Sequence, residues 1–487
     1  MKILIATFWQ MPHVGGVNRY LNLLSKELEE RGHQVDLLAH YPDMQKIYLQ
    51  RYRKKDEFSW TLSGQAVLKK KLMDRIFPEV YAYYQQNLPH VEPWIRWREI
   101  ERYLFELIAS LFDLHQYDLI HTHDLLATRA LWRVKPAHVP LVYKVHGLVA
   151  SVHVFNGEIK HKEELKWKYV AAEEYAAAMS CDALIVPSRW LMRDLTEEFK
   201  VPRERFRIIP YGLDIAPFLE QYGYEPYPPV NVSPNKLVIA CPARLSAEKG
   251  QKTLIEAVAR LKEQRSDFVC WLIGDGVQRS ELENYCQVLG VADRVVFLGD
   301  RSDVPALLRK AEIMVLPSLE DNQPHAIMEA QIAGKAIVAS DGGGIPEMIR
   351  HGETGLIFAK RNSEQLAAQL QLLLDNPELR SRLAANAREW GRKQWSSQVL
   401  CERTLEVYQA TVAAKKEQTK DPLGEPELTG QYGLSKPPGI KRDEPASMFR
   451  FAAMNSFRER EWRELANRLP QTYAIPDPFF VRTLAEG

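Results

Sequence analysis

The chain alternates between short apolar runs and amphipathic stretches. In its first part the apolar runs, rich in β-branched residues, stand at residues 2–8, 34–39, 119–121, 140–145, 183–186 and 206–210. Between the first two runs Leu21, Leu24 and Leu28 recur at the spacing of an amphipathic helix. Since strands that alternate with covering helices form parallel sheets, the pattern predicts an α/β domain over residues 1–222.

A second, similar pattern follows a Pro-rich stretch at residues 223–234 that has no clear periodicity. Its apolar runs stand at residues 237–241, 268–273, 295–298, 313–316 and 336–339. We therefore expect a second doubly wound α/β domain over residues 235–392. Residues 393–415 have a helical pattern and are expected to return to the first domain.

Two segments depart from this alternation. Residues 41–114 form an aromatic and basic insertion, and residues 416–487 begin with a Pro- and Gly-rich stretch typical of a linker or tail. Within the tail, residues 447–469 could form one helix. Within the insertion, segment 46–75 carries basic residues at 46, 51, 53, 54, 55, 69, 70, 71 and 75 and acidic residues at 56, 57 and 74, a local charge of +6. Two interpretations fit this segment. It is either a solvated helical insertion or a surface that docks on anionic lipid or on an anionic acceptor.

The overall composition is that of a soluble globular protein. Hydrophobic residues make up 46% of the 487 residues and charged residues 26%, which excludes a disordered chain and a polytopic membrane protein. The 64 basic residues nearly balance the 63 acidic ones, so no overall field favours nucleic acid. No uncharged run approaches the ~20 residues needed to span a bilayer. Five cysteines without a CxxC pair indicate neither disulfides nor a zinc site, and a cytoplasmic setting is expected.

The first candidate for chemistry is the sequence PARLSAEKG at residues 242–250. It follows a predicted strand and precedes a predicted helix, and Arg244 and Lys249 flank the loop between them. A helix N-terminus beside a guanidinium and an ammonium is a site that a diphosphate would favour. The alternative is that both are ordinary surface residues of a βα loop.

A second candidate lies between residues 317 and 349. Asp321 and Glu329 stand eight positions apart, the first in a loop and the second on the helix behind it, where carboxylates can accept hydrogen bonds from sugar hydroxyls without a metal. The glycines that follow the next strand, Gly342, Gly343 and Gly344, form a flexible turn whose amides could hold phosphate. The alternative is a βα turn with routine surface acids.

The first domain contributes His146, which follows a predicted buried strand and precedes a glycine. Ligands of α/β domains bind at the carboxyl ends of strands, which favours a functional role over that of a packed structural histidine. His121 and His123 are expected to line the acceptor side or simply to pack, because no third ligand at recognisable spacing completes a metal site.

Several short motifs, taken together and in order, resemble family 4 glycosyltransferases. They are a Gly-Gly loop after the first strand, VHG at 145–147, VPS at 186–188, IPYGLD at 209–214, RLSAEKG at 244–250, GDG at 274–276, the D-x7-E of Asp321 and Glu329, and the triple glycine. The resemblance covers residues 1 to about 410. It implies a GT-B fold, in which two doubly wound Rossmann-like domains face a central cleft, a nucleotide-sugar donor bound mainly by the second domain, and transfer with retention of anomeric configuration without a metal ion or other cofactor.

The resemblance also implies roles for single residues of the second domain. Arg244 and Lys249 would bind the donor diphosphate and stabilise the charge that develops on the leaving group. Glu329 would hold the ribose hydroxyls. Asp321 would correspond to the first acid of the family's E-x7-E motif, one methylene shorter, which puts its contact with the donor sugar in doubt. Gly274 and the triple glycine would lie along the donor.

In the first domain, His146 would lie near the hydroxyls of the donor sugar. Gly15 and Gly16 would let the backbone approach the phosphates. The predicted activity is transfer of a hexosyl or N-acetylhexosaminyl group from a nucleotide-diphosphate sugar to a hydroxyl of a glycan, lipid or small-molecule acceptor, in polysaccharide, glycolipid or cell-envelope glycan synthesis. A sugar-nucleotide epimerase and a non-catalytic sugar-nucleotide-binding subunit remain alternatives, and segment 46–75 would provide any peripheral contact with the inner face of the membrane.

Overall fold

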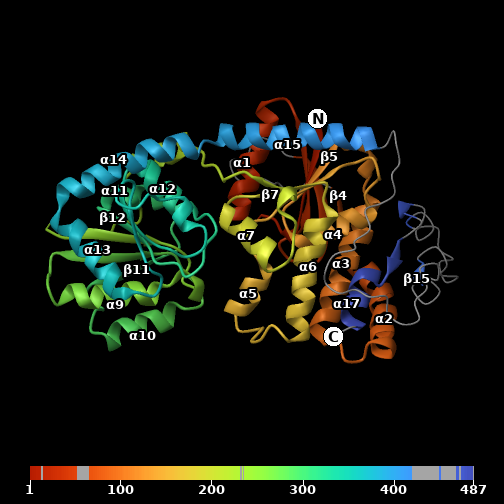
Figure 1. Ribbon diagram of the computed structural model, residues 1–487, viewed down its shortest axis with the longest axis horizontal. Helices are drawn as coiled ribbons and strands as arrows, with labels where there is room; N and C mark the ends of the chain where they lie inside the picture. The colour runs from red at the N-terminus through yellow and green to blue at the C-terminus, as the bar shows by residue number, and fades with distance from the viewer. Residues whose placement is uncertain are drawn as a thin grey trace. The chain divides into compact units, whose positions relative to one another are not determined.

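The protein divides into two units, each built around its own sheet (Figure 1). The computed structural model describes residues 1–12, 15–51, 65–230, 233, 235–418, 449–450, 465, 468–470 and 473–485. Unit 1 comprises residues 1–186, 192–208 and 401–487, and unit 2 comprises residues 187–191 and 209–400. Among the described residues, no helix is long and apolar enough to cross a membrane.

Unit 1 contains an eight-stranded sheet in the order β4-β3-β2-β1-β5-β6-β7-β8. Its strands are β1 (Lys2–Gln10), β2 (Gln34–His40), β3 (Lys46–Arg51), β4 (Gln65–Leu68), β5 (Leu119–Thr122), β6 (Leu141–Lys144), β7 (Ala183–Val186) and β8 (Phe206–Ile208). Each of the six apolar runs of the first pattern forms one of the parallel strands, because a strand covered on both faces must be apolar throughout.

Most helices of unit 1 fill the connections between these strands, and α15 follows unit 2 along the chain. They are α1 (Gly16–Glu30), α2 (Lys70–Asn87), α3 (Pro93–Leu111), α4 (Leu125–Val134), α5 (Val149–Phe155), α6 (Leu165–Ser180), α7 (Arg189–Glu197) and α15 (Ser397–Gln418), the last two of which also include residues of unit 2. The insertion at 41–114 contains two helices and also β3 and β4, which extend the sheet with antiparallel pairing. The sequence pattern did not predict these two strands.

The described basic residues of segment 46–75 are partly neutralised by ion pairs. Lys69 is buried and bonds to Glu101, with 2.5 Å between Nζ and Oε2. Arg51 lies 3.9 Å from Asp36, and Arg75 lies 3.9 Å from Glu79. Residues 52–64 lie outside the described part, so the structure accounts for only some of the +6 charge. In the described part, the segment is built into the sheet and into α2.

Unit 2 contains a six-stranded parallel sheet in the order β11-β10-β9-β12-β13-β14. Its strands are β9 (Leu237–Pro242), β10 (Phe268–Ile273), β11 (Val295–Gly299), β12 (Ile313–Leu316), β13 (Ala336–Ser340) and β14 (Leu356–Phe358). Its helices are α8 (Ile215–Tyr222), α9 (Gln251–Lys262), α10 (Arg279–Val288), α11 (Val304–Lys310), α12 (His325–Ala333), α13 (Ser363–Asp375) and α14 (Pro377–Gln394). All five predicted strands are present, and only the short β14 was missed. The two sheets confirm the predicted α/β class.

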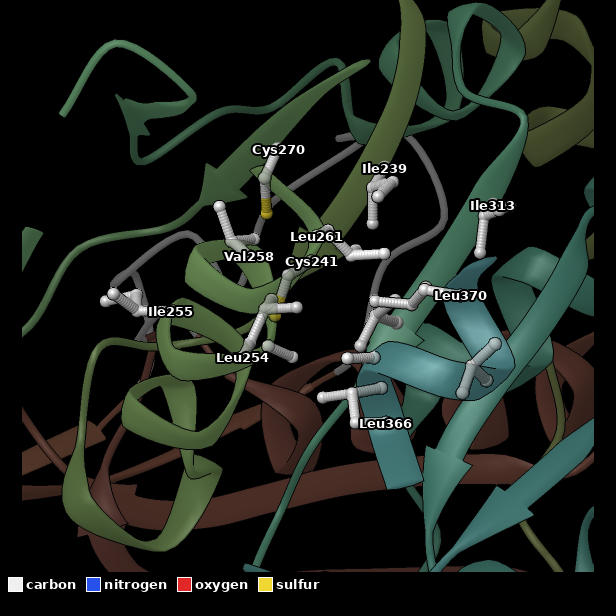
Figure 2. Close-up of a cluster of buried hydrophobic side chains, with 14 of the residues drawn as sticks. Ile239, Cys241, Leu254, Ile255, Val258, Leu261, Cys270, Ile313, Leu366 and Leu370 are labelled. Atoms are coloured by element: carbon white, nitrogen blue, oxygen red, sulfur yellow. The ribbon is translucent and has the colours of Figure 1, made fainter. Parts of the chain in front are cut away.

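The core of unit 2 lies between the sheet and the helices α9 and α13 (Figure 2). Ile239 and Cys241 on β9 face Leu254 and Val258 of α9, and all four are at most 1% exposed. Leu370 of α13 completes this layer. The structure places α8 in unit 2 although the Pro-rich stretch follows it, because α8 packs against α11 and α12.

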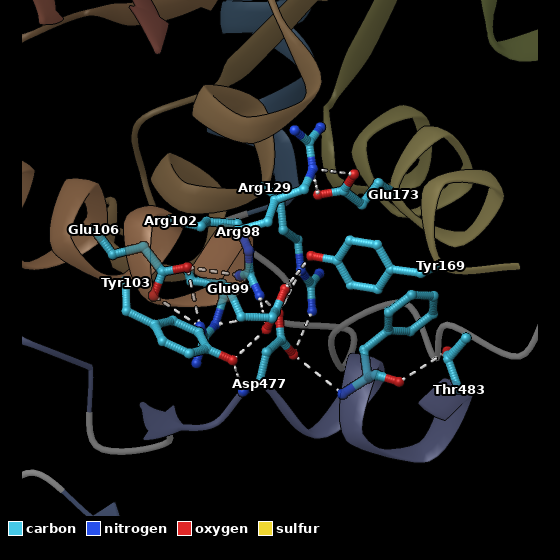
Figure 3. Close-up of polar contacts among 12 residues, drawn as sticks. Arg98, Glu99, Arg102, Tyr103, Glu106, Arg129, Tyr169, Glu173, Asp477 and Thr483 are labelled. Carbon is cyan, nitrogen blue, oxygen red and sulfur yellow. Dashed lines mark hydrogen bonds and ion pairs between the residues drawn. The ribbon is translucent and has the colours of Figure 1, made fainter. Parts of the chain in front are cut away.

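A C-terminal segment packs into unit 1 through a buried ionic cluster (Figure 3). Asp477 precedes α17 (Pro478–Ala485) and lies 3.1 Å from Arg102, 3.0 Å from Arg129 and 3.6 Å from Arg133. Around these groups, Arg102 pairs with Glu99 and Glu106, Arg133 with Glu106, and Arg98 with Glu173. The helix expected over residues 447–469 lies largely outside the described residues.

Asp477 stays ionised because of its partners. Burial alone would raise the pKa of its carboxyl, but Arg129, Arg133 and Arg102 outweigh burial and hold the pKa well below its usual range. Tyr103 Oη accepts a hydrogen bond from the amide of Asp477 at 2.8 Å. The segment is therefore tied to α3 and α4 by charge as well as by the packing of Phe480 on Tyr169.

Candidate functional site

Two of the predicted donor-binding residues, Lys249 and Asp321, form an ion pair. Lys249 ends a short 3-10 turn after β9, and Asp321 lies in the loop after β12. The distance from Nζ to Oδ2 is 2.5 Å, and the side chains are 17% and 15% exposed. The hydroxyl of Ser318 also donates to Oδ2, at 3.5 Å. Adjacent parallel strands bring their following loops together at one edge, which explains why residues 72 positions apart meet.

Arg244 and Glu329 occupy different environments on the same unit. The side chain of Arg244 is 78% exposed and lies 3.5 Å from Glu248, so its guanidinium is open to a ligand. Its carbonyl oxygen accepts from Nε2 of Gln251 at 2.6 Å, which fixes the backbone of the loop at the start of α9. Glu329 lies on α12, as expected, and is buried.

The glycines of this edge allow neighbouring loops to touch through their backbones. A Cβ on Gly343, whose φ is 68°, would collide with the carbonyl oxygen of Asp321, and one on Gly344 would collide with that of Asn322. Gly250, with φ 67°, makes the same close approach to Pro317. The amide of Gly344 donates to the carbonyl of Asp321 at 2.8 Å. The triple glycine is therefore a tightly packed turn that fixes the Asp321 loop, whereas the sequence suggested a flexible one.

Gly274 and Gly342 complete this packing. A Cβ on Gly274 would collide with the carbonyl of Ala243, and one on Gly342 with that of Ser318. The loops after β9, β10, β12 and β13 thus lean on one another at the carboxyl edge of the sheet. Such a layer holds Lys249 and Asp321 in place before any ligand arrives.

Two motifs that carried no assigned chemistry support the same loop. The hydroxyl of Ser188, in VPS, donates to Oδ1 of Asn322 at 2.5 Å. The amide of Tyr211, in IPYGLD, donates to Oε1 of Gln323 at 2.5 Å. Sequence reasoning recognised these motifs but did not predict that both hold the residues that follow Asp321.

In unit 1, His146 belongs to a row of aromatic side chains at the carboxyl ends of β5 and β6. Its Nε2 lies 3.1 Å from Nδ1 of His123, and its ring meets the edge of Tyr20 with centroids 5.1 Å apart. His121 bonds through Nδ1 to the hydroxyl of Tyr408 on α15, at 2.6 Å. His121 and His123 are buried, while His146 is partly exposed. Of the three histidines, His146 is the one that can reach a ligand.

Lys144 is a residue of this row that sequence reasoning missed. It is fully buried two positions before His146, with its ammonium 4.8 Å from the ring centre of Tyr20. Burial holds the pKa of Lys144 well below its usual value, and burial with the nearby Lys144 lowers the pKa of His121 to about 3. The pKa of His123 is also far below its usual value, chiefly through burial. A lysine inside an apolar strand was the available signal.

Asp124, at the end of the HTHD sequence, has a structural role. Its Oδ1 accepts from the amide of Ala127 and so caps α4, while its Oδ2 accepts from the hydroxyl of Thr7 and the amide of Phe8. The end of β1 is thereby fixed just before the Gly15–Gly16 loop. Gly15 is extended and Gly16 begins α1; their predicted approach to phosphates stays a prediction.

The described residues contain no group of three or more His, Cys, Asp or Glu side chains arranged to hold a metal ion. All five cysteines are reduced and buried. Burial raises the pKa of Cys181 to about 11 and that of Cys241 to about 12. These thiols are therefore core residues.

Comparison with known proteins identifies the two halves of the chain. Residues 227–390 match the family described as glycosyl transferases group 1, and residues 14–216 match glycosyltransferase family 4. An uncharacterized glycosyltransferase of Methanocaldococcus jannaschii is 24% identical over 417 residues, covering 84% of this chain and 98% of its own. An MMP alpha-(1->4)-mannosyltransferase of Mycolicibacterium hassiacum is 26% identical over 433 residues, covering 85% and 99%.

Solved structures share the fold. Sucrose-phosphate synthase from Thermosynechococcus elongatus superposes with a TM-score of 0.60 at 20% identity, covering 85% of this chain and 99% of its own. Anabaena HepE in complex with UDP-glucose gives a TM-score of 0.58 at 21% identity, covering 84% and 100%. Both likenesses extend over the two Rossmann-like units.

Proposed function

This chain belongs to the family 4 glycosyltransferases and has their GT-B fold, and from that premise we propose that it is a retaining, metal-independent enzyme. It transfers a hexosyl or N-acetylhexosaminyl group from a nucleotide-diphosphate sugar to an acceptor hydroxyl. The observation that carries the proposal is the carboxyl edge of the unit 2 sheet. There the half-buried ammonium of Lys249, the exposed guanidinium of Arg244 and the carboxylate of Asp321 lie on loops that pack against one another, and the buried carboxylate of Glu329 lies on α12 behind them.

Arg244 and Lys249 act on the leaving group. Cleavage of the bond between sugar and diphosphate leaves negative charge on the diphosphate, and two cations fixed beside it stabilise that charge without a proton transfer. Lys249 reaches the site from a turn that is held by the glycine contact of Gly250 with Pro317. Arg244 offers the planar fork that suits phosphate oxygens.

The remaining polar groups orient the two substrates. Glu329 is proposed to accept hydrogen bonds from the ribose hydroxyls. Asp321 is proposed to hold the ammonium of Lys249 in position and to contact the donor sugar. In unit 1, His146 is the partly exposed polar group of its row and is proposed to bond the hydroxyls of the transferred sugar. The acceptor, a glycan, a lipid or a small molecule, is proposed to bind unit 1, near the loops at the carboxyl edge of that sheet.

A peripheral contact with an anionic membrane is proposed for the start of α2. Lys70 and Lys71 are exposed there, and Trp97 of the adjoining α3 is 50% exposed beside Phe77. Exposed lysines near aromatic rings suit an anionic lipid surface. In sedimentation with vesicles that contain phosphatidylglycerol, the wild-type protein should pellet with the vesicles, and the K70E/K71E variant should stay in the supernatant. Equal fractions of both proteins in the pellet would contradict this contact.

The donor assignment is tested by thermal unfolding with UDP-, GDP- and ADP-sugars. A ligand at about 100 times its dissociation constant adds about 2.7 kcal/mol to the stability of the unit that binds it. We expect one nucleotide series to raise the melting temperature of the protein. If all three series leave it unchanged, the donor assignment is wrong.

A further inference from the structure

The loop that carries His146 is clamped at both ends. On the strand side, the amide of Val145 donates to the carbonyl of Ile185 on β7 at 2.9 Å. On the helix side, α5 begins at Val149, and its preceding residue, Leu148, has no side chain that can cap the helix. The first amides of a helix need acceptors from elsewhere when the cap residue is apolar.

The missing acceptor is a carboxylate from another helix. Oε1 of Glu174, on α6, accepts from the amide of Val149 at 2.7 Å and more weakly from that of Ala150 at 3.4 Å. Glu174 is 1% exposed, so these bonds lie where an unpaired group is costly. Only His146, Gly147 and Leu148 separate the two clamps.

Helix α6 is itself held firmly. Next to Glu174, Glu173 accepts two hydrogen bonds from Nε of Arg98, at 2.7 and 3.0 Å. Tyr169, one turn earlier, donates to Glu99 at 2.6 Å, in the cluster that Asp477 joins. A carboxylate mounted on such a helix can fix the position of a loop.

From this arrangement we propose that Glu174 is a positioning residue for the reaction: it caps α5 and thereby fixes the backbone that presents His146. The row of side chains around His146 sets the orientation of the ring through His123 and Tyr20. Glu174 sets the location of the backbone on which the ring is mounted. In this role Glu174 does not contact a substrate.

The test observes His146 directly. Protein labelled with carbon-13 at histidine gives a ring signal for His146, identified by its loss in the H146Q variant. Glu174→Asp keeps the charge but withdraws it by one methylene, and the His146 signal should shift or broaden. Glu174→Gln keeps an oxygen that can accept from both amides, and its spectrum should stay close to that of the wild type. Glu173→Gln, on the same helix but turned toward Arg98, is the matched control.

Two outcomes would overturn the proposal. One is an unmoved His146 signal in Glu174→Asp protein with native circular dichroism. The other is an equal response to Glu173→Gln, which would mean that the signal reports the general state of α6. Glu174→Ala is not required, so a failure of that variant to fold does not affect the test.

A kinetic readout rests on the proposed function. With UDP-glucose as the probe and water as the acceptor, Glu174→Asp should lower kcat about tenfold and leave KM within about twofold, since only the first-domain geometry changes. A rise in KM with unchanged kcat would contradict the positioning role. If the wild type turns over neither UDP-glucose nor any donor that raises its melting temperature, the proposed function fails, while the spectra still decide the role of Glu174.

Discussion

At the scale of single residues, the proposed binding of the donor diphosphate depends first on Lys249. Its ammonium lies 2.5 Å from Asp321 and its side chain is only 17% exposed, so the ammonium would be oriented before a diphosphate binds. Lys249→Ala should weaken binding of the nucleotide by about tenfold to a hundredfold, the usual effect of losing a hydrogen bond to a charged group. Calorimetric titration measures this change directly.

Lys252 provides the matched control for that measurement. It lies three positions further along, on α9, is 47% exposed and pairs with Glu281. Its replacement by alanine removes the same charge from the same region but not from the Asp321 loop. Equal losses of affinity in Lys249→Ala and Lys252→Ala would show that general charge, not the position of Lys249, binds the nucleotide.

The raised pKa of Glu174 predicts that the stability of the protein depends on pH. Burial raises the pKa of its carboxyl to about 7, although the amides of Val149 and Ala150 partly offset burial. Arg98 lowers this pKa, and Glu173 raises it. Because the folded protein holds this proton more tightly than the unfolded chain, stability from Glu174 is fully present below about pH 4.5 and is lost as the pH rises through 7.

The difference between 4.5 and 7 corresponds to about 3 kcal/mol. The free energy of unfolding of the wild type, relative to that of Glu174→Gln, should therefore fall by about this amount between pH 4.5 and pH 8. Chemical unfolding of both proteins across this range measures the difference, and all other titrating groups cancel. A constant difference would contradict the assigned pKa.

At the scale of elements, the triple-glycine turn makes a prediction about stability. Gly343→Ala places a Cβ at φ 68° against the carbonyl of Asp321. A left-handed alanine costs about 1 kcal/mol and the collision adds more, so the free energy of unfolding should fall by about 3 kcal/mol. Gly352→Ala is the control, since Gly352 has φ 80° but no neighbour within 4 Å. Equal losses of the free energy of unfolding in both variants would mean that the turn at Gly343 does not pack tightly against the Asp321 loop.

The C-terminal segment makes a second prediction at this scale. Asp477→Asn removes the carboxylate shared by Arg102, Arg129 and Arg133, and breaking a buried pair costs about 3–5 kcal/mol. Thermal or chemical unfolding measures the loss. Glu198→Gln, in the exposed pair with Lys162 of the same unit, should cost less than 1 kcal/mol. A loss as small for Asp477→Asn would mean that the segment does not stabilise unit 1.

These elements also show what sequence can and cannot predict. Apolar runs predicted the parallel strands because covered strands bury every position. The antiparallel strand β3 was missed because its run is mixed, with Arg51 and Gln50 among apolar residues. The docking of Asp477 could not be predicted, since its partner Arg102 lies 375 positions away and no pattern records that distance.

The candidate site divides in the same way. Lys249 and Asp321 were named from motifs, but their ion pair depends on the adjacency of β9 and β12. The role of Glu174 required the three-dimensional structure, because a carboxylate on one helix that caps another leaves no trace in spacing. The candidate residues of a site can therefore be predicted from sequence motifs, whereas the partner that each of them contacts depends on the order of the strands in the sheet.

At the scale of the whole molecule, the proposed function assigns different tasks to the two units. Unit 2 holds Lys249 and Arg244, the proposed ligands of the diphosphate, at the carboxyl edge of its sheet. Unit 1 holds His146 beside His121 and His123, whose pKa values lie far below the usual one. The central element of the proposed function is transfer of a sugar from a nucleotide with retained configuration.

The anomeric configuration of the released sugar tests that claim most directly. Proton spectra recorded as the enzyme hydrolyses an α-linked nucleotide sugar, UDP-glucose or whichever donor stabilises the protein, show which anomer forms first. A retaining transferase should release the α-anomer together with the nucleoside diphosphate, before mutarotation mixes the anomers. Initial release of the β-anomer, or accumulation of an epimerised nucleotide sugar, would contradict the account.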